Sequence, residues 1–455
     1  MARSVFRCAG CGAAPDPGDV YQWTCPNRWA GDDVDHVMAR QLDLSGLPFV
    51  TSDSANPFVR YRSLLHAYHL WVEGGGDDQG FVALVDELDD AVARVEGVGF
   101  RRTPLSSFDD LDRAIGSRVW VKDETGNVTG SHKGRHLFGL SIVLAVVERL
   151  GLADDRGERG LAIASCGNAA LAAAVIAAAA GRRLEVFVPP DAGPAVLGRL
   201  RELGATVTVS DRVGPATGDP CYHDFVAAVR AGAVPFGCQG PDNGLTIDGG
   251  RTLGWEIAEQ LAAAGTVADR MVIQVGGGAL ASASMAGFND AVDLGIVPTL
   301  PVFDCVQPEG GGMPLVRAYR SVVDRVAEGR DVEAVLAGAG SHRGGFMHAA
   351  QGVPVSVARG ILDDETYDWM AALRGVVVSG GEVLAVDEAT LVEANGLAAT
   401  ATGIDVDATG SAGLAGLLAL ARADRVPPGS EVVVVFSGAR RHRRSTRSAG
   451  PAGSG

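Results

Sequence analysis

Two lysines stand out in a chain that otherwise carries its positive charge on arginine. Of its 39 Lys and Arg residues, only Lys122 and Lys133 are lysine. Arginine can replace lysine on a protein surface, but it forms no Schiff bases and exchanges no protons near neutral pH, whereas a lysine amine does both. We therefore interpret both lysines as candidates for amine chemistry, Lys133 above all. An ordinary structural role is the alternative for each, and it suits Lys122 better.

The segment around Lys133 predicts how its amine is positioned. An apolar strand over 118–122 runs into a loop rich in Gly, Asn and Thr, and a helix follows. Ser131 is a good helix N-cap, so Lys133 is expected in the first helical turn. The helix dipole disfavours a protonated amine at that end, and Schiff-base formation requires the uncharged amine.

Three further segments place small or polar residues directly after predicted strands. Ser165-Cys-Gly-Asn168 opens an alanine-rich helix, where backbone amides can bind a carboxylate and the Asn168 side chain can bond an aromatic oxygen. Three glycines from Gly276 let the backbone wrap around a phosphate. Ser437 ends a buried strand, where its hydroxyl can meet a ring nitrogen. Taken singly, each segment also fits an ordinary turn.

Together, a lysine amine, a glycine-rich phosphate cradle, an asparagine and a serine at strand ends describe a site for pyridoxal phosphate. The glycine segment lacks the Gly-Lys-Ser/Thr ending of a nucleotide-triphosphate loop and the spacing of the dinucleotide motif. The sequence therefore predicts pyridoxal phosphate as the cofactor.

Parallel sheets are needed to bring these motifs together. Apolar strands alternate with alanine-rich helices, for example over 167–180 and 252–264, and this alternation predicts an α/β fold with helices on both faces of parallel sheets. The strands are expected at 118–122, 161–164, 184–188, 206–209, 271–275, 302–307 and 431–436.

Several motifs resemble those of the fold-type II pyridoxal-phosphate enzymes, and within that group those of threonine synthases. Asn127-Val-Thr-Gly-Ser-His-Lys133-Gly-Arg135 is similar to their Asn-Pro-Thr-Gly-Ser-Phe-Lys-Asp-Arg segment. Segment 165–168 resembles their Ser-x-Gly-Asn loop, 276–280 their phosphate loop, and 248–257 the helix that precedes it. The resemblance covers roughly residues 100–440, with the motifs in the same order, and implies the tryptophan synthase β-like fold.

A division of the chain follows from this resemblance and from local composition. A large domain that binds pyridoxal phosphate is expected over 35–135 and 249–440, and a small domain over 136–248. A degenerate zinc-ribbon-like module is expected over 1–34. The basic, then small and polar stretch 441–455 is expected to be a disordered tail.

The resemblance also implies roles for individual residues. Lys133 carries the cofactor as a Schiff base and moves the proton on the substrate Cα. Asn168 contacts the phenolic oxygen of the cofactor. Ser437 faces the ring nitrogen, and a neutral partner there favours elimination and replacement over transamination. The residues expected to hold the phosphate are Gly276, Gly277, Gly278, Ala279 and Leu280, and those expected to bind substrate are Ser131, Arg135, Ser165, Gly167, Asn168 and Arg251.

Four positions depart from the threonine synthase pattern. Val128, His132 and Gly134 stand where that family has Pro, Phe and Asp, and Cys166 fills the variable position of the Ser-x-Gly-Asn loop. Because these positions flank the substrate, the reaction has room to differ. His132 is expected either to point away from the cofactor or to act as an extra acid–base group. Cys166 is expected to pack beside the cofactor, with a nucleophilic role as the alternative.

The N-terminal module holds cysteines at a spacing typical of metal knuckles. Cys8 and Cys11 can bind one face of a tetrahedral zinc ion, and Cys25 follows fourteen residues after Cys11. A complete ribbon has a fourth thiolate, for which His36 is the available substitute. A module without metal and a three-Cys, one-His structural site are the two interpretations. Because His36 is distant in sequence, zinc is expected to bind weakly or not at all.

Composition restricts the class of protein. The net charge of −16 disfavours nucleic acid as a partner. The beginning of the chain has no apolar signal-like stretch, and the apolar run 171–180 is too short to span a bilayer. We therefore expect a cytoplasmic enzyme of small molecules that binds no membrane, and family analogy implies a homodimer.

Three functions compete at this stage. The first is a threonine synthase-like lyase that eliminates phosphate from O-phosphohomoserine and adds water at Cβ, with Arg135 and Arg251 as candidates for a second anion site. The alternative is an ammonia-lyase of the serine/threonine dehydratase type, or a β-replacement synthase, which the changes at 132, 134 and 166 favour. The third is a non-catalytic protein that keeps the fold, and retention of Lys133 argues against it.

Overall fold

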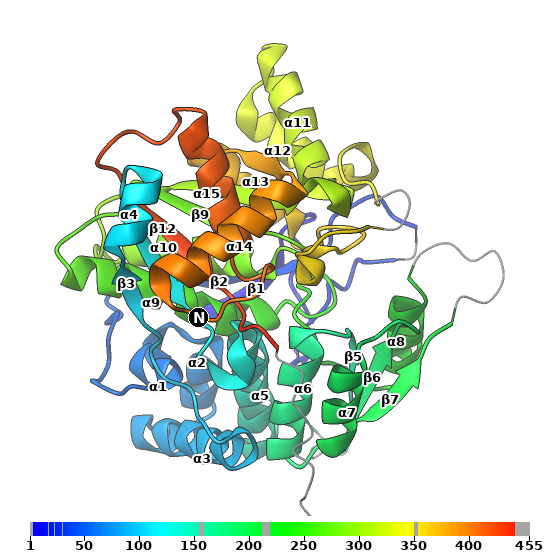
Figure 1. Ribbon diagram of the computed structural model, residues 1–455. Coiled ribbons are helices and arrows are strands. Elements are labelled where there is room, and N and C mark those ends of the chain that lie inside the picture. The colour runs from blue at the N-terminus through cyan, green and yellow to red at the C-terminus, as the bar shows by residue number, and fades with distance from the viewer. Residues whose placement is uncertain are drawn as a thin grey trace, which may run out of the picture.

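The structure of the chain is a computed structural model that describes residues 3–16, 18–21, 23–29, 31–153, 159–211, 219–349 and 354–441. Within these residues the chain forms a six-stranded sheet, a four-stranded sheet and a two-stranded N-terminal sheet (Figure 1). The large sheet has the strand order β11-β10-β9-β12-β4-β3, and the small sheet has the order β7-β6-β5-β8.

The strand bounds agree closely with the expected ones. The strands are β1 Ser4–Cys8, β2 Met38–Leu42, β3 Leu105–Ser107, β4 Arg118–Asp123, β5 Leu161–Ala164, β6 Leu184–Val188, β7 Thr206–Val209, β8 Val234–Pro235, β9 Arg270–Gln274, β10 Val302–Pro308, β11 Val383–Val386 and β12 Glu431–Phe436. All seven expected strands are present. Short strands β1, β2, β3, β8 and β11 were not expected, because their pairing partners rather than their own patterns make them strands.

The large sheet is parallel except for β3, and helices cover both of its faces. In the central strand β12, Val433 and Val435 belong to the core on one face, and Val432 and Val434 to the core on the other. Helices α9 and α10 lie on the first side, and α4, α14 and α15 lie on the second (Figure 1). Burial on both faces explains why β12 reads as an unbroken apolar run.

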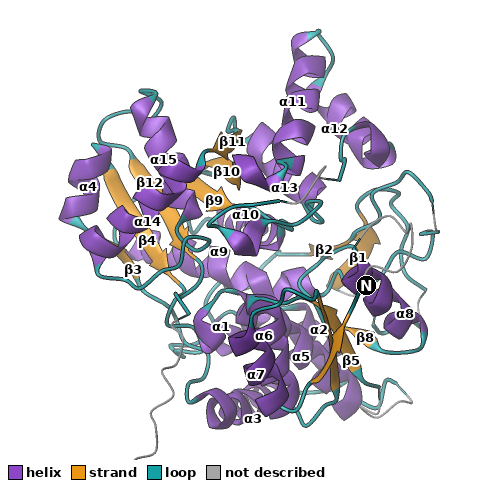
Figure 2. Ribbon diagram, turned by 45° about the vertical axis from the view of Figure 1, so that its right-hand side comes forward, coloured by secondary structure: helices purple, strands orange, loops and turns teal. Residues whose placement is uncertain are grey.

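The small sheet is covered in the same way. Ile163 of β5 and Val186 of β6 share a core with α6, whereas the adjacent residues Ala162 and Phe187 pack with Phe225 of α8. The alternation follows from the two-residue period of a strand. Figure 2 shows this sheet as a separate unit beneath the large one. Strands 161–235 therefore form their own sheet inside the expected small domain.

Fifteen α-helices are present in the described residues. They are α1 Pro57–Arg60, α2 His66–Glu73, α3 Asp78–Glu96, α4 Asp109–Ile115, α5 Lys133–Arg149, α6 Asn168–Ala179, α7 Pro194–Glu202, α8 Pro220–Arg230, α9 Thr246–Ala263, α10 Ala279–Asp293, α11 Pro314–Ala327, α12 Val332–Ser341, α13 Trp369–Val378, α14 Glu388–Thr402 and α15 Ala412–Arg422. None of the helices in these residues is long and apolar enough to cross a membrane.

The N-terminal module extends further than 1–34. Strand β2 pairs antiparallel with β1 from Ser4 opposite Leu42 to Cys8 opposite Met38, so the hairpin closes only after residue 34. The expected boundary was wrong because pairing across a long connection leaves no local signal.

A buried ionic cluster joins β4, α5 and α9. Lys122 Nζ lies 2.5 Å from Glu256 Oε1, and Arg135 lies 2.8 Å from Glu124 and 3.0 Å from Glu256. All four side chains are at most 1% exposed. Two cations balance two carboxylates, which is the condition under which such a cluster is tolerated in a core. Lys122 is thus a structural residue, which agrees with the alternative to amine chemistry that the sequence left open.

Replacing Glu256 with glutamine should leave the two buried cations with one surplus positive charge. We expect a loss of about 3–5 kcal/mol in the free energy of unfolding, measured by urea denaturation. The control is Glu393→Gln, which breaks the exposed pair with Arg422 and should cost at most about 1 kcal/mol. Equal losses in both variants would contradict the structural role.

The same cluster should make the stability of the fold depend on pH. Burial by itself raises the pKa of Glu124, but Arg135 and Lys122 outweigh it and hold the pKa at about 2. A carboxylate with a lowered pKa stabilises the fold above its ordinary value of about 4.3, and this contribution is lost as the pH falls toward 2.

Candidate functional site

Lys133 is the first residue of α5 and follows a distorted loop. Thr129 has φ 59° and Gly130 has φ 65°, both in the left-handed region. A threonine there is strained, and such strain is found chiefly at functional sites. The structure corrects one expectation, because the N-cap position is His132, with no side-chain cap bond, and the Ser131 hydroxyl has no partner among the described residues.

The segment after β12 runs beside this loop and holds it. Ser131 forms an antiparallel bridge with Gly438. The His132 amide donates to the Ser437 carbonyl at 3.1 Å, and the Ala439 amide donates to the Gly130 carbonyl at 2.8 Å. Residues about 300 positions apart in the sequence therefore fix the start of α5 and the position of Lys133.

Titratable side chains surround the Lys133 amine. Burial, with the Lys133 charge next, lowers the pKa of His132 far below its ordinary value and that of His136 to about 3. Burial raises the pKa of Asp363 to about 6 and that of Asp368 to about 7, although the Lys133 charge opposes both rises. His132 is therefore a neutral imidazole beside the amine, and its ring packs at 81° to that of His136.

The glycine cradle connects β9 to α10 and is formed by 276–280. A Cβ on Gly276 would clash with Asp363 Oδ2, one on Gly277 would lie 3.0 Å from the Tyr367 ring, and Gly278 has φ 94°. Larger residues would not fit at these positions. Helix α10 begins at Ala279 without a side-chain cap, so its first amides are free to bind an anion.

An acidic side chain already uses one donor of this cradle. The Asp363 carboxylate accepts a hydrogen bond from the Gly277 amide. The segment 361–368, which carries Asp363, packs over all three glycines. The cradle therefore binds a carboxylate oxygen in the way that it would bind a phosphate oxygen. No sequence motif predicted that segment 361–368 would lie here.

Ser437 is oriented by a residue that the sequence analysis missed. Gln274, the last residue of β9, directs its Nε2 toward Ser437 Oγ at 2.7 Å and toward the Gly410 carbonyl at 2.8 Å. Since the serine oxygen accepts this bond, its own proton is free to be donated to another group. A glutamine at the end of an apolar strand, two residues before the first glycine, was the available signal.

The 165–168 loop opens at the start of α6. The Gly167 amide donates to Ser165 Oγ at 3.3 Å, and a Cβ on Gly167 would meet no atom within 4 Å, so its backbone borders open space. The Asn168 side chain lies against Gly438. Cys166 is exposed, and desolvation, followed by Asp191, raises its pKa, which disfavours a nucleophilic thiolate.

Two arginines that were expected to bind substrate form ion pairs with carboxylates of the protein instead. Arg135 is 1% exposed and paired with Glu124 and Glu256 in the ionic cluster. Arg251 binds both carboxylate oxygens of Asp290 at 3.0 and 3.1 Å. The structure contradicts their assignment to a substrate anion site, because each guanidinium neutralises a buried carboxylate.

Arg441, the first residue of the stretch that was expected to be a tail, lies against the site. Its Nε and Nη2 donate to Asn168 Oδ1 at 3.0 and 2.6 Å, and Nη2 also donates to the Thr129 carbonyl at 2.9 Å. The remainder of that tail, 442–455, lies outside the described residues.

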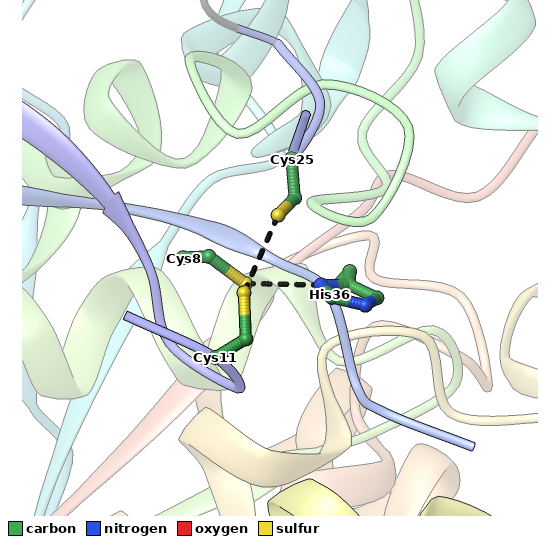
Figure 3. A group of neighbouring side chains, drawn as sticks. All are labelled: Cys8, Cys11, Cys25 and His36. Atoms are coloured by element: carbon green, nitrogen blue, oxygen red, sulfur yellow. Dashed lines mark hydrogen bonds between the residues drawn. The ribbon is translucent and has the colours of Figure 1, made fainter. Parts of the chain in front are cut away.

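The N-terminal cluster brings four metal-ligating side chains together (Figure 3). Atoms of Cys8, Cys11, Cys25 and His36 lie within 4.8 Å of one another. Cys8 Sγ is 3.3 Å from His36 Nδ1, and Cys11 Sγ is 3.6 Å from Cys25 Sγ. The expectation that His36 is too distant was wrong, because β2 pairs with β1 and returns it to the knuckle.

Comparison with known proteins identifies the family. Residues 98–438 match the family of pyridoxal-phosphate dependent enzymes. The chain belongs to this family. It is 28% identical to the threonine synthase of Methanosarcina acetivorans over 339 residues, 74% of each chain. It is 26% identical to that of Synechocystis sp. over 402 residues, 87% of this chain and 86% of the relative.

Solved structures confirm the expected fold type. A threonine deaminase from T.th. has a TM-score of 0.57 and 24% identity, over 79% of this chain and 99% of that one. Maize serine racemase has a TM-score of 0.57 and 19% identity, over 79% of this chain and 94% of that one. The chain therefore has the fold of these structures. The family that it matches is one of enzymes, so the interpretation as a non-catalytic protein is not supported.

The residues present fit the family's cofactor. Besides the cradle and the Lys133 amine, polar atoms without partners in the described residues gather here: Thr129 Oγ1, Ser131 Oγ, His132 Nδ1 and Gln274 Oε1. Buried polar groups are normally paired. Several orphans around one amine indicate a polar ligand.

Replacing Asp363 with asparagine should strengthen cofactor binding in a pH-dependent way. The wild-type carboxyl has a pKa of about 6, so it is charged at pH 8 and opposes a phosphate in the cradle, whereas at pH 5 it is mostly neutral. We expect the variant apoprotein to bind pyridoxal phosphate about tenfold more tightly than wild type at pH 8, and about equally at pH 5, in a fluorescence titration.

The control is Asp364→Asn, which removes the neighbouring, exposed carboxylate and should have little effect. An unchanged affinity of Asp363→Asn at pH 8 would show that the carboxylate does not oppose the phosphate.

Proposed function

We propose that the protein is a threonine synthase-like lyase that converts O-phosphohomoserine and water into threonine and inorganic phosphate. The carrying observation is the lysine amine at the start of α5, beside a glycine cradle and a serine that has a free proton. The threonine synthase relatives support the substrate.

The cofactor would be held by residues that follow four strands, β4, β5, β9 and β12. Lys133 would bind its aldehyde carbon, Asn168 its ring oxygen and Ser437 its ring nitrogen. The amides of Gly276, Gly277, Gly278, Ala279 and Leu280 would bind its phosphate. Bound in this way, pyridoxal phosphate supplies an electron sink for the carbanion at the substrate Cα.

The chain's own groups perform the proton transfers. The Ser437 oxygen accepts a hydrogen bond from Gln274. Its hydroxyl would donate a hydrogen bond to the ring nitrogen and leave that nitrogen unprotonated. The Lys133 amine takes a proton from Cα and returns one to the substrate. Ser165 and the first amides of α6 bind the α-carboxylate. A second proton would leave Cβ, phosphate would leave Cγ with the electron pair of its C–O bond, Cγ would gain a proton, and the hydroxyl of water would add at Cβ.

One observation favours the alternative, an ammonia-lyase of the serine/threonine dehydratase type or a β-replacement synthase. The expected phosphate-binding arginines, Arg135 and Arg251, are bound to buried carboxylates. A substrate with an uncharged side chain would need no second anion site.

The test is a spectral and product screen of the holoenzyme. We expect phosphate release and threonine formation from O-phosphohomoserine, and borohydride should fix the cofactor on the peptide that contains residue 133. Lys133→Ala should lower turnover by about 10²–10⁴-fold.

Two results would contradict these proposals. Pyruvate or 2-oxobutyrate from serine or threonine, without turnover of the phosphorylated substrate, would replace the lyase assignment by the ammonia-lyase. Cofactor fixed on the Lys122 peptide would overturn the assignment of Lys133.

We also propose that the N-terminal module binds a structural zinc ion through Cys8, Cys11, Cys25 and His36. Ligands of a tetrahedral zinc ion lie about 3.3–3.8 Å apart, and the separations of 3.3 and 3.6 Å agree with this spacing. His36 Nε2 lies 2.9 Å from Asp32 Oδ2. A carboxylate on the far nitrogen orients a histidine ligand and raises its basicity.

Metal analysis of protein purified without chelator should give one zinc per chain. Cys11→Ser should lower the zinc content and the melting temperature, because one of four ligands is lost. Cys221→Ser, a buried cysteine of α8 outside the cluster, is the control for zinc content. Full zinc occupancy in the Cys11 variant would contradict the assignment.

The homodimer and the cytoplasmic location stay predictions. Light scattering of the purified protein would measure its molar mass and so test the homodimer.

A further inference from the structure

A cation at the mouth of the site has no role in the chemistry described so far. The Arg441 guanidinium uses Nε and Nη2 to bind Asn168 Oδ1, and Nη2 to bind the Thr129 carbonyl. Nη1 has no hydrogen bond to the described part of the chain. The side chain therefore combines a fixed position with a donor that is free for a ligand.

The backbone before Arg441 explains why the side chain is fixed. The Ala439 amide donates to Gly130 at 2.8 Å and the Arg440 amide donates to Asp405 at 2.9 Å. Val406 forms an antiparallel bridge with Ala439. The segment after β12 is thus clamped between the Lys133 loop and 405–406, and Arg441 emerges from it facing Asn168.

The surroundings make a cation necessary for an anionic substrate. Desolvation, and after it the carboxylates of Asp191, Asp219 and Asp363, raise the pKa of Cys166, which lies two residues before Asn168. These carboxylates would also repel a phosphorylated amino acid. Arg441 contacts the Lys133 loop through the Thr129 carbonyl. In the same loop Thr129 Oγ1 and Ser131 Oγ are buried without partners in the described part of the chain, on side chains that are 3% and 0% exposed. These hydroxyls and the guanidinium together suit a phosphate group.

We propose that Arg441 binds the phosphate of the substrate's side chain, together with the hydroxyls of Thr129 and Ser131. The inference rests on the proposed function, in which the α-carboxylate is bound at the start of α6, and it supplies the second anion site that Arg135 and Arg251 do not form. A guanidinium is suited to this role because its planar fork binds phosphate oxygens in pairs.

The experiment compares two amino acids that differ in their terminal anion. Holoenzyme is titrated with 2-amino-5-phosphonopentanoate and with norvaline, and binding is followed through the cofactor absorbance. In Arg441→Gln we expect phosphonate affinity to fall about 10- to 100-fold, with norvaline affinity nearly unchanged. The ratio of the two affinities decides the question, because a role confined to orienting Asn168 would weaken the binding of both ligands equally.

Neighbouring variants sharpen the comparison. Arg440→Gln keeps the chain length and changes the net charge equally, but Arg440 pairs with Asp405 and Asn395, so both affinities should stay at wild-type values. Arg441→Lys should recover part of the phosphonate affinity, because the charge returns without the fork.

The outcomes separate this inference from the proposed function. An equal loss for both ligands, or an unchanged phosphonate affinity in Arg441→Gln, would overturn it. If wild type prefers the phosphonate and Arg441→Gln abolishes that preference, the inference holds even where O-phosphohomoserine is not turned over, a result that would remove the proposed reaction alone.

Discussion

The balanced charge cluster of Lys122, Arg135, Glu124 and Glu256 is the interaction on which the site depends. It lies where β4, α5 and α9 meet, and each of its side chains is at most 1% exposed. Removing a partner from such a cluster leaves a buried charge, so the three elements are held in one arrangement. Because Arg135 is two residues after Lys133, that arrangement also sets where the amine lies.

Two segments distant in sequence complete the site around this frame. Residues 361–368 cover the glycine cradle and bring Asp363 to the Gly277 amide. Residues 437–441 follow the Lys133 loop and bring Ser437 and Arg441 to it. Asp363 accepts a hydrogen bond from the Gly277 amide, which a phosphate would also need, and in our proposal Arg441 attracts the anionic side chain of the substrate.

The N-terminal module is connected to the same region. Asp35 directly precedes His36, a proposed zinc ligand, and its carboxylate accepts a hydrogen bond from Trp369 Nε1 at 2.9 Å. Trp369 follows Asp368, whose amide donates to the Gly277 carbonyl at 2.8 Å. A metal ion that rigidifies the knuckle would therefore also stabilise the segment that covers the cradle. The N-terminal module would in this way support the site.

The sequence by itself determined the elements with strong local signals. The seven apolar strands, the glycine loop and the exceptional Lys133 are read from adjacent residues, because burial on both faces, close backbone approach and amine chemistry each demand particular residue types. Only the tertiary structure decided the rest. Arg135 resembled a substrate ligand until Glu124 and Glu256 were found against it, and His36 stood apart from the cysteines until β1 and β2 paired. Arg441 lay in a stretch whose composition is that of a tail. Charge pairing and metal coordination depend on distances in space, and residues remote in sequence set those distances.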